Sequence, residues 1–135
     1  MSIEAMVVFD KNVLMPETMT GFGKDVIEMI ALGQIIPIYD KTIMKEYEAE
    51  PCSEYCGMIK EKGILVKDAT MVIEEFKDKG IAPVYIVKEC GEDCEDGVLD
   101  DGTMTPKVLL NILSFIRFYK LKIDFKKAIE EIKRL

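Results

Sequence analysis

The sequence contains no histidine among its 135 residues. This absence excludes a Ser-His-Asp triad, a histidine general base and every zinc site that uses imidazole ligands. Any chemistry that the protein performs must therefore rely on carboxylates, thiolates, lysines or hydroxyl groups.

Long apolar runs are also absent, since no segment approaches the ~20 apolar residues that a transmembrane helix needs. The first residues, Met1–Ala5, carry no basic side chain and do not look like a secretory signal peptide. We therefore expect a cytoplasmic protein that does not bind membranes. In that compartment thiols are usually reduced or bound to metal, with thermophilic archaea as the known exception.

Charged residues are unevenly distributed along the chain, whose formal net charge is −7. Residues 89–101 contain seven acidic side chains and no basic one, and such a segment repels phosphate groups unless a metal ion is bound within it. Residues 117–135 contain seven basic and three acidic side chains, which suits either contact with nucleic acid or an ordinary exposed helix. We expect the neighbouring aromatic side chains Phe115, Phe118 and Tyr119 to be buried.

Apolar runs alternate with helical patterns over most of the sequence, which predicts an α/β fold. A composition of 49% apolar and 32% charged residues is typical of globular proteins, and the length predicts one domain, residues 1–135. We expect a three-layer α/β sandwich with a four-stranded, mainly parallel sheet. The strands are expected at residues 5–9, 34–39, 64–66 and 83–87, and the helices between them at 24–32, 40–50 and 71–79. Asp40 is expected to cap the second of these helices, and Asp68 or Thr70 the third.

The C-terminal part departs from this alternation and predicts two successive helices. Thr105 followed by Pro106 is a typical helix start, and residues 108–119 are apolar nearly all round. Such a helix lies either in the centre of a core or in a subunit interface. We expect a homodimer formed through this helix, and the substitution Leu113→Asp would separate a dimer from the alternative. The alternative is that the final amphipathic helix, which carries Phe125, covers it within one chain.

The four cysteines fall in two pairs of identical CxxxC spacing, Cys52 with Cys56 and Cys90 with Cys94. The repeated spacing suggests one site built from two segments, with Cα atoms under about 7 Å apart if a disulfide joins them. Four thiolates can also hold zinc or an iron–sulfur cluster, although the usual zinc spacing is CxxC. Disulfides and free thiols in the core are the alternatives.

Two segments place acidic residues beside predicted strands. Residues 7–14 read VVFDKNVL, a strand followed at once by Asp10 and Asn12. Residues 31–47 read as a helix end, a strand and a helix that closes on Glu46–Tyr47. Together these segments resemble the PIN family of metal-dependent ribonucleases, whose first strand carries a DxN signature and whose second acid stands in a Glu-Tyr pair.

The resemblance implies a metal site at the carboxyl end of the sheet, where open α/β sheets place their ligands. Asp10, Glu46 and Asp68 would hold Mg²⁺ or Mn²⁺, with the carboxylates of Asp10 and Glu46 within about 8 Å of each other. The fourth carboxylate would come from Asp93, or from Glu89 in its place. RNA is the substrate that the resemblance implies.

Other positions leave the resemblance open at several points. Asn12 would support the first carboxylate, whereas Lys11 stands where the family usually has a small hydroxyl residue. A second register would take the last two acids from Asp101 and Asp124. An inactive relative that keeps the fold fits the same motifs.

A non-enzymatic protein is the alternative from a different functional class. In this interpretation Cys52, Cys56, Cys90 and Cys94 form a site that holds zinc, an iron–sulfur cluster or disulfides. The domain would then serve regulation or assembly, with its apolar helix as the dimer contact. Zinc or iron that is stoichiometric with the four cysteines would favour this alternative over a nuclease.

Overall fold

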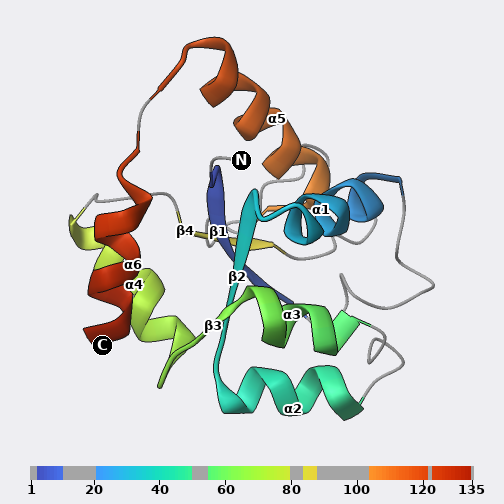
Figure 1. Cartoon of the computed structure of the whole chain (residues 1–135), viewed down its shortest axis with the longest axis vertical. Helices are drawn as coiled ribbons and strands as arrows, with labels where there is room; N and C mark the ends of the chain where they lie inside the picture. Colours follow the sequence, from blue (N-terminus) through green and yellow to red (C-terminus); the bar gives the residue numbers. More distant parts are fainter. Residues whose placement is uncertain are drawn as a thin grey trace.

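The computed structural model describes residues 3–10, 21–49, 55–79, 84–87, 104–121 and 123–134. This part of the chain forms four strands and six helices (Figure 1). In chain order they are β1 (Ala5–Phe9), α1 (Gly21–Ala31), β2 (Ile35–Tyr39), α2 (Lys41–Ala49), α3 (Cys56–Lys62), β3 (Ile64–Leu65), α4 (Ala69–Lys79), β4 (Val84–Val87), α5 (Pro106–Phe118) and α6 (Phe125–Arg134). None of these helices is long and apolar enough to cross a bilayer.

The strands form one parallel sheet in the order β3-β2-β1-β4. This confirms the α/β fold with a four-stranded parallel sheet. β2 and β3 are added in turn on one side of β1, whereas β4 is added on the other side. The direction of strand addition therefore reverses at β1, and the carboxyl ends of β1 and β4 flank the switch point of the sheet.

β1 is the centre of the fold, because all five of its residues are buried. Ala5, Val7 and Phe9 belong to the core on one face of the sheet, whereas Met6 and Val8 belong to the core on the other. The alternation follows from the period of two in a strand. A continuous apolar run such as this one is what a parallel strand covered on both faces requires.

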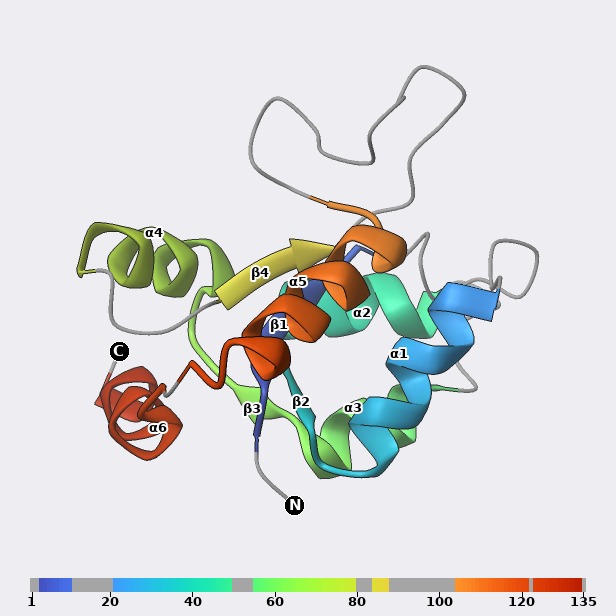
Figure 2. The same ribbon diagram turned by 90° about the horizontal axis from the view of Figure 1, so that it is seen from above.

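Helices cover both faces of the sheet, an arrangement compatible with a three-layer sandwich (Figures 1 and 2). On the first face α1, α3 and α5 contribute Val26, Ile59 and Leu109 to the core. On the second face α4 and α6 contribute Phe76 and Ile132. α5 and α6 therefore contribute to the cores on opposite faces, so the alternative in which the final helix covers α5 is wrong.

The aromatic side chains at the end of α5 are a second correction. Phe115, Phe118 and Tyr119 are 57%, 79% and 58% exposed, although the sequence pattern led us to expect them buried. α5 buries Leu109 and Leu113, which lie one turn apart, while its C-terminal end extends beyond the strands at the top of Figure 1. Because Leu113 is only 1% exposed within its own chain, Leu113→Asp would disturb the core of a single chain and would not separate a dimer from a monomer.

α3 is a helix that the sequence pattern does not predict. It has only seven residues, with Gly57 inside it and Gly63 after it, too short for an apolar period to stand out. A Cβ atom at Gly63 would lie 2.5 Å from the carbonyl oxygen of Ile59 and 2.7 Å from that of Pro37. Glycine therefore lets α3 end directly against β2.

The hydroxyl of Tyr47 joins α2 to the carboxyl end of β1. Tyr47 is 1% exposed and donates a hydrogen bond to the backbone carbonyl of Phe9, the last residue of the strand. Leaving a buried acceptor without its donor costs about 1–3 kcal/mol. This bond therefore determines where α2 sits relative to the end of β1.

The substitution Tyr47→Phe should lower the free energy of unfolding by about 1–2 kcal/mol, because the ring remains while the Phe9 carbonyl loses this donor. Urea denaturation of both proteins measures the difference. Tyr55→Phe, at a half-buried ring in the same core, is the control and should change it by under about 0.5 kcal/mol. Equal losses in the two variants would mean that the Tyr47 hydroxyl does not hold α2.

Candidate functional site

Asp10 lies at the switch point of the sheet. It is half-buried, directly follows β1, and donates its backbone N–H to the carbonyl oxygen of Val87 in β4 at 2.9 Å. Open α/β sheets bind ligands in the crevice outside the carboxyl ends of the strands at such a point. The position that the sequence pattern selected for the first acid is therefore the position that the topology favours.

Glu46 and Tyr47 are neighbours in α2, but Glu46 is exposed and Tyr47 is buried. Tyr47 points into the core and holds the helix at the end of β1, as described above. Glu46 is exposed, since consecutive residues on a helix do not face the same side. The Tyr47 contact brings α2 to the strand that ends in Asp10, whereas the approach of the Glu46 and Asp10 carboxylates stays a prediction.

Asp40, at the end of β2, uses both of its carboxylate oxygens to join two helices. Oδ1 accepts the backbone N–H of Ile43 at 2.8 Å and caps α2, as the sequence predicted. Oδ2 accepts the backbone N–H of Ala69, the first residue of α4, at 3.0 Å. The second partner is 29 residues away, so no local pattern reveals it. Asp40 is 9% exposed and serves the fold.

Asp68 is the cap of α4, one of the two caps that the sequence suggested. Its Oδ1 accepts the backbone N–H groups of Thr70 at 2.9 Å and Met71 at 3.3 Å. It follows β3, and the strand order puts β2 between β3 and β1. Neighbouring strands are about 4.8 Å apart, so Asp68 belongs to a strand roughly 10 Å from the one that ends in Asp10.

Of the remaining predicted ligands, the structure describes Asp124 alone. Asn12, Glu89, Asp93 and Asp101 lie outside the described residues. Asp124 caps α6, because its Oδ1 accepts the backbone N–H of Lys127 at 3.1 Å. Within the described ranges no three acidic or cysteine side chains come close enough to hold a metal ion. A complete metal site would therefore need acids from the segments around positions 12 and 89–101.

Cys56 is the one predicted thiol that the structure describes, since the other three lie outside the described residues. It opens α3, is 7% exposed, and lies in the core as a free thiol. Burial raises the pKa of the Cys56 thiol, Glu48 raises it further, and Lys60 opposes the shift. Its surroundings are those of a core cysteine.

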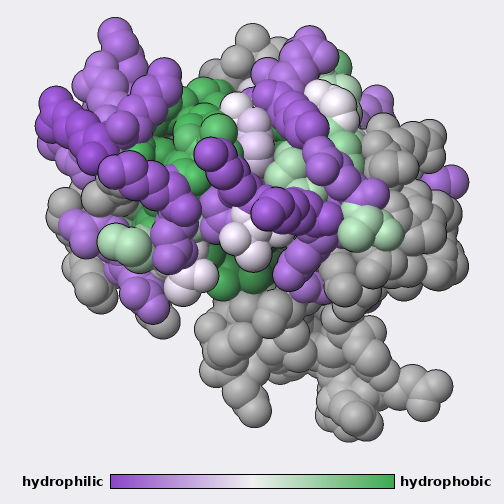
Figure 3. Space-filling view, turned by 90° about the horizontal axis from the view of Figure 1, so that it is seen from below, coloured by the Kyte–Doolittle hydropathy of each residue, from purple (hydrophilic) through white to green (hydrophobic). Residues whose placement is uncertain are grey.

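Two lysines near the carboxyl ends of the strands were not among the site residues predicted from the sequence. Lys41 follows Asp40 at the start of α2, and Lys67 follows the end of β3. Together with Thr42 they line a hollow of about 440 Å³, which also contains Leu65 and Val66. Figure 3 views the molecule from the α2 side and shows mostly hydrophilic side chains around an apolar strip. The strand-end rule that selected Asp10 would also have found both lysines.

Comparison with known proteins finds no match: no family model fits the chain, and no curated protein or solved structure is similar to it.

The free energy of unfolding should fall as the pH rises above about 8.5, where an unfolded thiol begins to lose its proton. Because burial raises the pKa of Cys56, the folded state keeps that proton longer, so the unfolded state binds fewer protons and gains stability with pH. Urea denaturation between about pH 8 and 9.5 measures the slope. Cys56→Ala should flatten it, whereas an unchanged slope would show that Cys56 does not titrate differently on unfolding.

Proposed function

We propose that this chain is a metal-dependent ribonuclease of the PIN type, or an inactive relative that keeps the frame of its site. The observation that carries the proposal is the position of Asp10, at the carboxyl end of β1 beside β4. The same aspartate heads the DxN motif that resembles the family. Topology and motif are independent of each other, and they select one residue.

The attachment of α2 supports the same proposal. Tyr47 binds the carbonyl of Phe9, the residue before Asp10, so the helix that bears Glu46 is held at the candidate site. The two residues of the Glu-Tyr pair then have different roles. Its tyrosine fixes the helix in the core, and its glutamate occupies the exposed side at the same level.

The acidic segment supplies the missing ligands in this proposal. β4 pairs with β1 and ends at Val87, two positions before the seven acids of residues 89–101. Asp10, Glu46 and Asp93, or Glu89 in its place, would hold Mg²⁺ or Mn²⁺. The bound metal would activate water and stabilise the charge on the phosphodiester. Asp68 is the weakest member of the set, since its carboxylate already caps α4.

RNA is the substrate that fits the charge around this edge. The chain carries −7 overall, so a polyanion needs local positive charge to approach. Lys41 and Lys67 provide it on the walls of a hollow at the carboxyl ends of β2 and β3. Their ammonium groups would contact backbone phosphates next to the scissile one.

The second candidate is a non-enzymatic assembly protein with a site for zinc, an iron–sulfur cluster or disulfides at Cys52, Cys56, Cys90 and Cys94. The exposed aromatic end of α5 favours an assembly role. The position of Cys56 in the apolar core counts against a site that uses all four thiolates. Metal analysis of the purified protein separates the two candidates, since the nuclease needs no zinc or iron.

The purified chain should cleave single-stranded RNA when Mn²⁺ or Mg²⁺ is added, and cleavage should stop with a chelator. Asp10→Asn should lower the rate at least about a hundredfold, because the substitution removes a charged ligand without changing the side-chain volume. Asp25→Asn, at an exposed position of α1, is the matched control and should keep the full rate.

Equal rates for the wild type and Asp10→Asn would assign any cleavage to a contaminant or to another site. Absence of cleavage together with Mn²⁺ binding that depends on Asp10 identifies the inactive relative. Absence of both would remove this proposal and leave the assembly protein.

A further inference from the structure

The C-terminal end of α5 carries a ridge of exposed apolar side chains, which we call the aromatic ridge. It consists of Phe115, Phe118, Tyr119 and Leu121, which are between 52% and 79% exposed. The rings of Phe115 and Tyr119 lie 4.5 Å apart, and those of Phe118 and Tyr119 lie 5.0 Å apart. Exposed apolar patches of this kind mark contact surfaces in soluble proteins more often than chance.

The backbone holds the ridge in one shape. Lys120 has φ +53°, in the left-handed region, and its N–H donates to the carbonyl of Arg117 at 3.2 Å. The N–H of Leu121 donates to the carbonyl of Ile116 at 3.1 Å. These two bonds form a Schellman motif, in which the left-handed position is normally glycine. A lysine adopts this conformation at some conformational cost.

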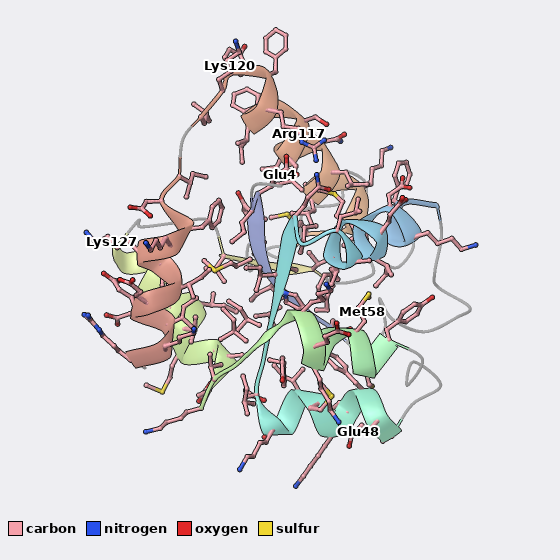
Figure 4. All side chains as sticks on the ribbon, viewed as in Figure 1. Glu4, Glu48, Met58, Arg117, Lys120 and Lys127 are labelled. Atoms are coloured by element: carbon pink, nitrogen blue, oxygen red, sulfur yellow. The ribbon has the colours of Figure 1, made fainter. Side chains whose placement is uncertain are left out.

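A bidentate ion pair anchors the same end of α5 to the sheet. Arg117 Nε and Nη2 donate to the two carboxylate oxygens of Glu4, each at 2.5 Å, and Figure 4 shows the two side chains meeting. The hydrogen bond to Glu4 raises the pKa of Arg117. The ridge is thereby held by its helix, its cap and this pair, and is organised before any partner arrives.

A groove lies beside the ridge, and Leu121 belongs to both. Its volume is about 530 Å³, and most of its walls are apolar, with charged groups at the rim. The lining residues are Ile3, Glu4, Ile116, Arg117, Lys120, Leu121, Ile123 and Phe125. A projecting aromatic ridge and a hollow with apolar walls therefore lie next to each other on one surface.

We propose that this surface is the contact of a two-fold homodimer, in which the aromatic ridge of each copy fills the groove of the other. A two-fold contact needs a patch that is complementary to itself. Adjacent ridge and groove meet that need, because rotation about an axis between them exchanges one for the other.

The exposed apolar area supplies a large part of what such a contact needs. The exposed parts of the three aromatic side chains alone offer roughly 400 Å². The walls of the groove and Leu121 add to this, toward the ~800 Å² per partner of a standard interface. Aromatic side chains and arginine, which this surface combines, are the residues enriched at the centres of interfaces.

Charge argues against nucleic acid or a membrane as the occupant. Aromatic side chains near Arg117 and Lys120 would suit stacked bases or a lipid surface. However, Arg117 already has its carboxylate partner in Glu4, and the chain as a whole carries −7. Among the described residues of the ridge and groove, Lys120 is the other cation, which is too little positive charge for a polyanion.

Sedimentation velocity of the full chain tests the proposal, at about 100 μM protein and in both low salt and about 0.5 M NaCl. The wild type should sediment as a dimer in both, because an apolar contact does not weaken with salt. Phe118→Glu should weaken dimerisation at least about a hundredfold, since it places charge at the most exposed point of the ridge.

Two controls keep the test decisive. Phe22→Glu, at a 47% exposed ring of α1 outside the ridge, should leave the dimer intact. Circular dichroism should show unchanged helix content for Phe118→Glu, so that loss of the dimer is not loss of the fold. Leu113→Asp is not informative, because Leu113 is buried in the monomer and its replacement would unfold the chain.

Three results would overturn the proposal. They are a monomeric wild type at this concentration, a dimer that survives Phe118→Glu, and a dimer that Phe22→Glu dissociates equally. Binding of a single-stranded oligonucleotide or of anionic vesicles that Phe118→Glu abolishes, in a monomeric protein, would assign the ridge to that ligand instead.

Discussion

The double burial of β1 is the constraint on which the rest of this structure depends. All five residues of the strand are buried, and strands pair with both of its edges. The two cores lie on opposite faces of this sheet, so each face needs helices to cover it. Because β1 ends inside the molecule, the residue after it, Asp10, has little freedom of position. The position of the candidate site is therefore determined by β1, the strand whose residues are all buried.

Side chains at the carboxyl ends of the strands then fasten the surrounding helices. Tyr47 holds α2 to β1, and the Asp40 carboxylate joins the start of α2 to the start of α4 across the sheet edge. At the opposite end, Glu4 and Arg117 fasten α5 to the amino end of β1. The strand thus separates two surfaces, a polar candidate site at its carboxyl end and an apolar contact surface at its amino end.

The sequence predicted much of the fold and less of the site, for physical reasons. The strands were found because burial on both faces leaves uninterrupted apolar runs, and the caps at Asp40 and Asp68 because capping is local chemistry. The short helix α3 was missed. Phe118 was expected to be buried, because the apolar pattern of a helix does not show where the helix extends beyond the sheet. The second bond of Asp40 and the contact of Tyr47 join distant residues, which one sequence does not pair.

The central claim, that the end of β1 beside β4 binds a divalent cation, is tested most directly by Mn²⁺ added below one equivalent to ¹⁵N-labelled protein. Paramagnetic broadening should appear first at the backbone amides of Asp10 and Val87. The amide of Glu4, six residues from Asp10 along β1 and roughly 20 Å away, should stay sharp. Uniform broadening, or broadening strongest at the acids of α6, Glu130 and Glu131, would contradict the account.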